Sequence, residues 1–274
     1  MKLAIFATIG AAFRFCWYHR GQFYSLALPA IVVLSILSTL ASSTFLAGTN
    51  STFFFDFFGL QVQSNGKPFG HYSDSPWTVV IELGIFVLMV VVFPLYSVAW
   101  HRLFLLPQED LTILDCYRWQ SRHWSFLWAN IKIFLFIIPM GLLGFLITAA
   151  SLIFAPIVGI VIVLFVVMCY ARFSMWLPAA ALDTKLELAD VLEMTKGHGW
   201  QLAAILIITG LATGLMDGIA TGLIAGASGS ISVVGNLTQS LLTNLALFSI
   251  MYAGMAVGIT ALSMAYAKLT ELNP

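Results

Sequence analysis

Charged residues are scarce in this chain. Asp, Glu, Lys and Arg make up 9% of its 274 residues, whereas a typical soluble domain carries about 25%. Twelve basic and twelve acidic side chains are too few to cover the surface of a globular protein of this length. The scarcity therefore excludes a soluble enzyme, a disordered chain and a nucleic-acid-binding protein with a basic face.

Cysteine and catalytic motifs are scarce as well. Cys16, Cys116 and Cys169 form no CxxC pair, so the sequence predicts neither a zinc site nor a disulfide framework. Five histidines are present, but neither HExxH nor GxSxG occurs. We expect no catalytic residue, no metal site and no cofactor. An enzyme that acts on lipid headgroups within the membrane is accordingly disfavoured.

Hydrophobic residues are abundant, at 60% of the total, and they form long runs. A membrane-spanning helix needs about 20 apolar residues. The run from Phe126 to Pro178 is too long for one crossing. We divide it at Ala155-Pro156, because proline disfavours a helical conformation in the residue before it. Six spans result: Gln22–Gly48, Trp77–Arg102, Phe126–Ala155, Pro156–Pro178, Trp200–Gly226 and Leu237–Ala267.

These spans predict an all-α polytopic membrane bundle, with residues 1–274 as a single membrane domain. Residues 49–76 form an insertion between the first two spans. The apolar start of the chain, up to Arg14, imitates a signal peptide but lacks a small-residue cleavage site. We expect this segment to be retained and to lie at the membrane interface.

The basic residues predict the orientation. With a cytoplasmic N-terminus, eleven of the twelve Lys and Arg residues fall at or near the cytoplasmic side, and only Lys67 falls on the other. Lys and Arg are enriched in cytoplasmic loops of membrane proteins. The sequence therefore predicts that both termini are cytoplasmic and that residues 49–76 lie outside.

The cytoplasmic segments resemble one another. Leu111–Arg122 and Leu186–Lys196 each place charged residues on one stripe of a short helix, which is typical of an interfacial helix. Each is followed by a His near an aromatic residue that opens the next span. The chain can thus be divided into three units, each an interfacial helix followed by a helical hairpin. The alternative is that any polytopic protein alternates spans with polar turns.

Two stretches carry a family resemblance. One is Val98–Leu106, which contains Trp100, His101 and Arg102. The other has the pattern Arg-x-Ser-x-x-x-Pro-Ala from Arg172, followed by Thr-x-Gly-x-x-Trp from Thr195 to Trp200. Together they resemble bacterial inner-membrane proteins of the YciC-like type, akin to the membrane domain attached to some glycerophosphodiester phosphodiesterases. The resemblance implies a bacterial inner-membrane location and about six helices, and it transfers no catalytic residue.

We call the key residues of these two stretches the interfacial elbow, and most of them have a structural interpretation. The elbow consists of Trp100, His101, Arg102, Arg172, Pro178, Thr195, Gly197 and Trp200. Arg102 and Arg172 end their spans, where basic side chains reach the headgroups. Pro178 ends or kinks the fourth span, and Gly197 lets the chain turn. Tryptophans occupy the span ends, at Trp100, Trp176 and Trp200. For the histidines of these junctions, headgroup contact or helix capping is favoured over metal binding.

Two acidic residues fall inside the predicted spans. Glu82 lies near the start of the second span and Asp217 well into the fifth, both in the outer half of the bilayer. Polar groups at membrane depth are functional hypotheses by default. A carboxylate pair there can bind a cation or relay protons, with Lys67 or His71 as a further partner. The alternative is that each is satisfied by water or a neighbouring helix.

The fifth span has a repeated glycine. The glycines recur every four residues, which is a small-xxx-small pattern that permits close approach between helices. The partner is the sixth helix, with Gly254, Ala256 and Gly258, or another subunit; a flexible gating helix is the alternative. The stripe consists of Gly210, Gly214, Gly218, Gly222 and Gly226.

Two functions remain from different classes. The first is a non-catalytic bundle that binds membrane lipids, other membrane proteins or a second copy of itself, in envelope maintenance or assembly. The second is a small-molecule or ion transporter that uses Glu82 and Asp217 in a polar path. The direction in which Asp217 points discriminates between them.

Overall fold

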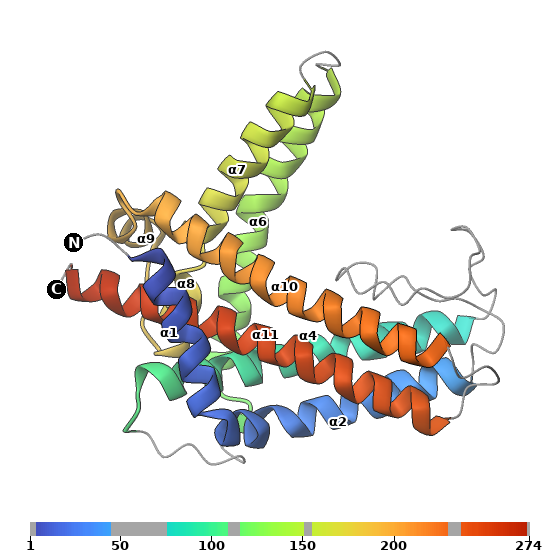
Figure 1. Cartoon of the computed structure of the whole chain (residues 1–274). Helices are drawn as coiled ribbons and strands as arrows, with labels where there is room; N and C mark the ends of the chain where they lie inside the picture. Colours follow the sequence, from blue (N-terminus) through green and yellow to red (C-terminus); the bar gives the residue numbers. More distant parts are fainter. Residues whose placement is uncertain (1–3, 45–75, 109–115, 151–154, 230–236, 273–274) are drawn as a thin grey trace. The chain divides into compact units, whose positions relative to one another are not determined.

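The chain folds into helices joined by turns. The computed structural model describes residues 4–44, 76–108, 116–150, 155–229 and 237–272. The insertion at residues 49–75 lies outside the described residues. The helices are α1 (Ile5–Tyr18), α2 (Arg20–Thr44), α4 (Pro76–Leu105), α6 (Ser121–Ala150), α7 (Ala155–Phe173), α8 (Trp176–Ala181), α9 (Leu188–Met194), α10 (Gly199–Gly229) and α11 (Leu237–Leu272) (Figure 1).

Within the described ranges, six helices are long and apolar enough to cross a membrane. They coincide with the six predicted spans, which confirms the all-α class and the number of spans. The division at Ala155-Pro156 is also correct, because α6 ends at Ala150 and α7 begins at Ala155. The spans begin or end up to five residues away from the predicted positions, since hydropathy does not mark where a helix is capped.

Two of the three short helices were expected. α1 is a separate apolar helix of 14 residues, and α9 matches the segment Leu186–Lys196. Val191 and Thr195 face the interior, whereas Asp190 and Glu193 are exposed, so α9 is amphipathic as predicted. Of the other expected helix, Leu111–Arg122, residues 111–115 lie outside the described residues. It does not continue to Arg122, because residues 118–120 are not helical and α6 begins at Ser121.

The described chain divides into two compact units. Unit 1 comprises Met1–Leu26, Pro94–Met216 and Ala253–Pro274, and unit 2 comprises Ala27–Phe93 and Asp217–Tyr252. The helices α2, α4, α10 and α11 each contribute residues to both. All the described Lys and Arg residues belong to unit 1. The single domain expected for residues 1–274 stays a prediction.

The core of unit 1 is built around α8. All six residues of this short helix are buried, in a cluster with the C-terminal part of α11 and the first turns of α6 and α10. Phe173 stacks on Trp176, and the two ring centroids are 5.7 Å apart. Lys132 of α6 places its Nζ over the same Trp176 ring, 5.7 Å from the centroid. The segment between α7 and α9 is thus packed into the core of unit 1 as α8.

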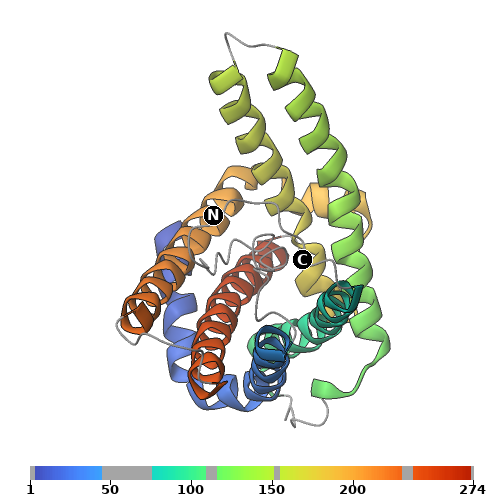
Figure 2. The same ribbon diagram turned by 90° about the vertical axis from the view of Figure 1, so that its right-hand side faces the viewer.

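The helices α6 and α7 form an antiparallel hairpin, which both views show side by side (Figures 1 and 2). Their contact is close at Gly144, where an added Cβ would overlap Cγ2 of Ile162. Much of the remaining hairpin surface is exposed and apolar, including Leu135, Leu142 and Val161. An exposed apolar surface of this kind suits contact with lipid tails.

Unit 2 has polar side chains between its helices. Ser35 and Thr39 of α2 are buried. Asn244 of α11 donates a hydrogen bond from Nδ2 to Thr39 Oγ1 over 2.9 Å and so joins α11 to α2. Hydrogen bonds between polar side chains are a common means of holding helices together in lipid, where the hydrophobic effect does not drive their association.

Candidate functional site

A network of buried polar side chains lies in unit 1, where α1, α4 and α11 meet. Trp100 donates from Nε1 to the carbonyl of Ala256 at 3.0 Å and to Thr260 Oγ1 at 2.9 Å. His101 Nδ1 lies 2.7 Å from Ser263 Oγ. Trp100 and His101 are almost completely buried, with exposures of 0% and 1%.

This burial corrects the prediction for Trp100 and His101. Both were expected at the membrane surface as an interfacial anchor and a headgroup contact. Instead their polar atoms bond to α11, more than 150 residues away in sequence. The hydrophobic pattern places them at the end of a span, but it does not show that a later helix covers them. Trp176 is likewise buried, and its Nε1 donates to the carbonyl of Leu186.

The same network contains a cysteine. Cys16 of α1 places its Sγ 3.6 Å from Thr260 Oγ1. Burial raises the pKa of the Cys16 thiol to about 11, because desolvation penalises the thiolate more than the hydrogen bond with Thr260 lowers the pKa. At neutral pH this thiol is therefore protonated and a poor nucleophile.

A second set of contacts surrounds the C-terminal end of α8. The N–H of Asp183 bonds to the carbonyl of Ala180, and the N–H of Thr184 bonds to that of Ala179. This is a Schellman motif with Asp183 in the left-handed position, at φ +59°, which glycine usually occupies. The carbonyl of Ala181 accepts a hydrogen bond from Arg102 Nη1 at 3.0 Å.

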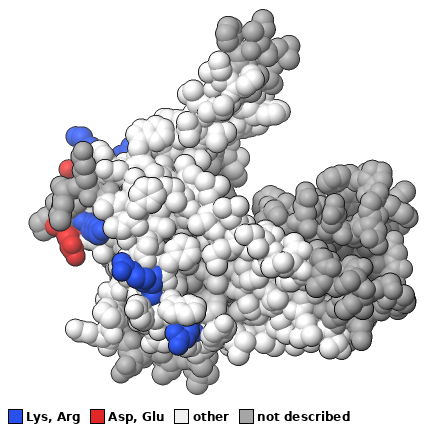
Figure 3. Space-filling view, viewed as in Figure 1, with Lys and Arg blue, Asp and Glu red and all other residues white. Residues whose placement is uncertain are grey.

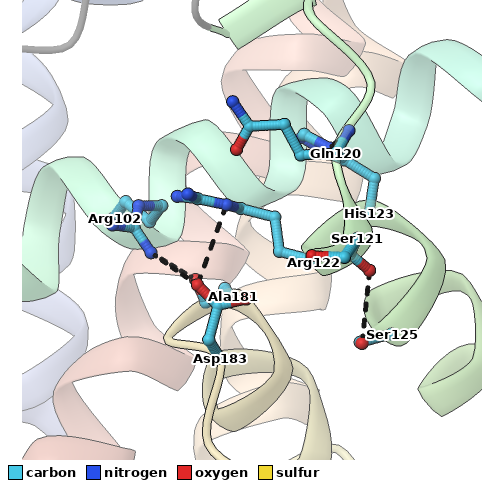
Figure 4. Close-up of polar contacts among 8 residues, drawn as sticks. All are labelled: Arg102, Gln120, Ser121, Arg122, His123, Ser125, Ala181 and Asp183. Atoms are coloured by element: carbon cyan, nitrogen blue, oxygen red, sulfur yellow. Dashed lines mark hydrogen bonds and ion pairs between the residues drawn. The ribbon is translucent and has the colours of Figure 1, made fainter.

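Two guanidinium groups share the carboxylate of Asp183. Arg102 Nη1 lies 3.6 Å from Asp183 Oδ2, and Arg122 Nε lies 3.8 Å from the same oxygen. Figure 4 shows that Arg102 from α4 and Arg122 from α6 both approach this end of α8. Arg102 is buried, so it does not reach out to the headgroups as expected. It holds α4 to α8 instead.

Neither Asp183 nor Arg122 was singled out as a site residue. A signal was present, because Asp183 follows an alanine-rich run that favours a helix, and Asp tolerates the left-handed conformation better than most residues. Its two basic partners are 81 and 61 positions away in the numbering, so no local pattern could pair them. Long-range pairs of this kind need the tertiary structure.

Arg172 joins the two halves of the motif that carries the family resemblance. Its Nε donates to Thr195 Oγ1 at 2.8 Å, and its Nη2 donates to the carbonyl of Leu192 at 2.7 Å. Arg172 therefore ties the end of α7 to the last turn of α9. Thr195 is buried and also donates to the carbonyl of Val191 at 2.7 Å.

The two glycines of this motif serve different purposes. Gly197 adopts φ +78°, so it makes the turn that was predicted. Gly199 is needed for space instead, because an added Cβ would lie 3.3 Å from Cδ of Arg172 and 3.4 Å from Cγ of Met168. Gly199 thus lets the start of α10 approach the end of α7.

Pro178 does not end the fourth span. The helix α7 ends at Phe173, and Pro178 lies in the first turn of α8, where a missing N–H is tolerated. The proline still contributes to the break. It has no N–H to bond the carbonyl of Ser174, and that carbonyl instead accepts from Leu177 in a tighter turn. The predicted kink is therefore present, but four residues earlier than expected.

Two histidines, His19 and His123, cap helices, which is one of the two expected roles, whereas His198 contacts another side chain. His19 Nδ1 donates to the carbonyl of Phe15 at the end of α1. His123 Nδ1 accepts from the N–H of Gln120 at the start of α6, and His198 Nδ1 lies 2.7 Å from Gln201 Oε1 at the start of α10. His71 lies outside the described residues.

The intramembrane acids are described unequally. Asp217 lies in α10, and its Oδ1 is shielded from solvent without a hydrogen-bond partner among the described residues. Glu82 lies in α4, but its side chain is outside the described part. Lys67 is also outside it. The shared site of Glu82 and Asp217 therefore stays a prediction.

The glycine stripe of α10 is open. A Cβ added at Gly210, Gly214, Gly218 or Gly222 would meet no described atom within 4 Å, and Gly226 is not described. The close approach between α10 and α11 uses Gly254, whose added Cβ would lie 3.2 Å from Cβ of Thr213. Packing of the stripe against the sixth helix thus finds no support, and packing against another subunit stays a prediction.

Exposed aromatic residues mark the starts of three spans in unit 1. Trp17 and Tyr18 precede α2 and are 69% and 77% exposed. Trp124 opens α6 and Trp200 opens α10, with exposures of 62% and 59%. Trp and Tyr favour the interface between membrane and water. Trp200 is exposed at the start of α10, and its place at that interface stays a prediction. This arrangement separates the exposed tryptophans from the buried Trp100 and Trp176.

Comparisons with known proteins find no match. No protein family, no curated protein and no solved structure matches the chain. The six apolar helices nevertheless identify a multi-pass membrane protein.

Proposed function

We propose that this chain is a bacterial inner-membrane protein with both termini in the cytoplasm, and that it binds phospholipids in the maintenance or assembly of the envelope. The observation that carries the proposal is the surface of unit 1. Exposed Trp and Tyr side chains at three span starts lie in the same unit as all the described Lys and Arg residues. Aromatic side chains at headgroup depth and basic side chains beside them are typical of a lipid-binding surface.

The polar contacts of the elbow support a binding bundle rather than a reaction centre. Arg102 and Arg172 use their guanidinium donors to tie helices together, and His19 and His123 cap helix ends. The direct bond between Arg172 and Thr195 connects the two halves of the motif into one structural unit.

The lipid-binding function is tested with the full-length protein in nanodiscs that contain phosphatidylcholine and phosphatidylglycerol in equal amounts. Native mass spectrometry then counts the lipids that stay bound after release from the disc. We expect several phospholipids to be retained through a wash that removes bulk lipid. A protein that retains none at comparable activation energy would contradict the proposal.

A transporter is the second candidate, and Asp217 is the observation that favours it. A carboxylate oxygen that is shielded from solvent within a span, without a described partner, suits a site for a proton or a cation. We expect Asp217→Asn to leave abundance and folding nearly unchanged. If this substitution abolishes a proton- or ion-coupled flux in proteoliposomes, the transporter replaces the lipid-binding bundle as the main function.

A further inference from the structure

The outer face of α1 lacks a partner among the described residues. Thr8, Ile9 and Ala12 of this helix are buried in unit 1, whereas Phe6, Trp17 and Tyr18 are exposed. At about 100° per residue, Phe6 and Trp17 point within about 20° of each other and away from the buried side. The helix therefore presents an exposed face that carries Phe6, Trp17 and Tyr18 together with Gly10 and Arg14, and the described residues of its own unit do not cover this face.

This face must lie at a membrane surface. α1 has 14 residues, which corresponds to a length of about 21 Å and is too short to cross a hydrocarbon core of about 30 Å. Only His19 separates α1 from α2, which is a candidate span from Arg20. Because α2 starts its crossing there, the C-terminal end of α1 lies where the crossing begins.

The charge of this face has one sign. Arg14 and Arg20 are exposed beside the aromatic residues, and no acidic residue occurs before Asp56. Arg20 places its guanidinium carbon 5.3 Å from the centroid of the Trp17 ring and donates from Nη1 to the Trp17 carbonyl at 3.3 Å. In Figure 3 Lys and Arg side chains appear on the part of the surface that α1 occupies in Figure 1, and the visible Asp and Glu side chains lie toward its edge.

We infer that the outer face of α1 lies in the headgroup layer and binds anionic phospholipid, with Phe6, Trp17 and Tyr18 at acyl-chain depth and Arg14 and Arg20 on the phosphates. The inference rests on the proposed lipid-binding function and assigns its site. Amphipathic helices with aromatic residues on one face and flanking cations bind membrane surfaces in this way, and each cation adds attraction to anionic lipid.

The test compares three forms of the full-length protein in nanodiscs of equal phosphatidylglycerol and phosphatidylcholine. They are the wild type, Arg14→Gln/Arg20→Gln, and the control Lys185→Gln/Lys196→Gln. The control removes the same charge from exposed positions that flank the acidic residues of α9. The readout is the ratio of the two lipids retained in native mass spectrometry, and thermal unfolding checks that all three forms fold.

We expect the wild type and the control to prefer phosphatidylglycerol, and this preference to fall about 25-fold in the double arginine variant. Each cation near an anionic surface contributes roughly a factor of five. If the arginine variant keeps the wild-type preference, or the control loses as much, the α1 site is overturned while lipid binding stands. If the wild type retains no phospholipid, the proposed function falls together with the site.

A second measurement locates α1 without relying on charge. The fluorescence contribution of Trp17 is obtained by subtracting Trp17→Phe from the wild type, in nanodiscs with brominated acyl chains. We expect brominated lipid to quench this contribution and aqueous iodide to leave it largely intact. Quenching by iodide alone, or by neither agent, would place Trp17 in water or under another protein, and either result would overturn the inference.

Discussion

Arginine side chains complete the ends of two helices in unit 1. Arg102 bonds the last carbonyl of α8, and Arg172 bonds the carbonyl of Leu192 in α9. A guanidinium group suits this role, because its several N–H donors lie in one plane and can bond two acceptors at once. Arg172 does so with Thr195 and Leu192, which a lysine ammonium at the same position cannot reproduce in the same geometry.

We expect Arg172→Lys to destabilise the protein although the charge is kept. Loss of the paired hydrogen bonds costs about 1–3 kcal/mol for a charged donor. Thermal unfolding in detergent measures the change, with Lys196→Gln as the control, since Lys196 is exposed at the end of the same motif. An Arg172→Lys protein that unfolds at the wild-type temperature would contradict the bonding described.

The thiol of Cys16 provides a test of burial that depends on pH. With a pKa of about 11, only about one thiol in a thousand is ionised at pH 8, because ionisation falls tenfold per pH unit below the pKa. In a Cys116→Ser/Cys169→Ser background, we expect iodoacetamide to modify Cys16 slowly at pH 8 and about tenfold faster at pH 9. The same protein unfolded in dodecyl sulfate should react readily at pH 8. Equal rates in both states would show that Cys16 is not buried.

Residue positions along the helices could be read from the sequence, but residue environments could not. Trp100 and Trp200 have the same apparent position at the end of a span, yet only Trp200 is exposed. The difference comes from Ala256 and Thr260 of α11, which cover Trp100 and accept its N–H. No periodicity within one helix contains this information, because the partners are contributed by a segment far along the chain.

Among the helices, hydropathy and length were sufficient to find the six spans and the turn between α6 and α7. They were not sufficient for α8, because the run from Pro156 to Ala181 has a high mean hydropathy of 2.4 and Arg172 is its only charged residue. The break after Phe173 arises from hydrogen bonding, as the proline at position 178 leaves the Ser174 carbonyl to a tighter turn. An apolar run therefore predicts a span well and its internal break poorly.

For the glycines as well, a repeated sequence pattern did not predict where helices come into close contact. The four described glycines of the α10 stripe meet no described atom within 4 Å. Close helix contacts form instead at Gly144, which stands in no four-residue repeat, and at Gly254, which lies four residues before Gly258. Repetition every four residues indicates a smooth helix surface. The sequence alone does not show which neighbour lies against it.

We expect Gly144→Leu to destabilise the α6–α7 hairpin, and Gly141→Leu to have little effect. A side chain at position 144 overlaps Ile162, which is branched at Cβ and cannot easily move aside, whereas position 141 has no atom within 4 Å. Overpacking of this kind costs about 1–3 kcal/mol. Thermal unfolding and limited proteolysis of both variants measure the difference, and equal stability would argue against the hairpin contact.

At the scale of the whole molecule, the described basic residues are gathered in one of the two units. All the described Lys and Arg residues belong to unit 1, whose residues include both chain ends. If these cations face the cytoplasm, as the enrichment of Lys and Arg in cytoplasmic loops predicts, both termini lie inside.

Reporter fusions in a bacterial host test this orientation. We expect green fluorescent protein to fluoresce at either terminus, because it matures in the cytoplasm, and alkaline phosphatase to be active when inserted after Lys67. A fluorescent fusion after Lys67 with inactive reporters at the ends would reverse the topology. The C-terminal fusion with alkaline phosphatase serves as the control and should be inactive.

Asp183 imposes an unusual restriction on what can replace it. Its left-handed backbone favours Gly, Asn or Asp, while the neighbouring Arg102 and Arg122 need a negative charge between them. Glycine would suit the backbone and asparagine would suit both the backbone and hydrogen bonding, but each would leave two cations facing one another. Glutamate would supply the charge, but it does not favour the left-handed backbone conformation that the turn requires. Among the residues that favour this backbone, aspartate alone carries a negative charge, so one residue both forms the turn and contacts Arg102 of α4 and Arg122 of α6.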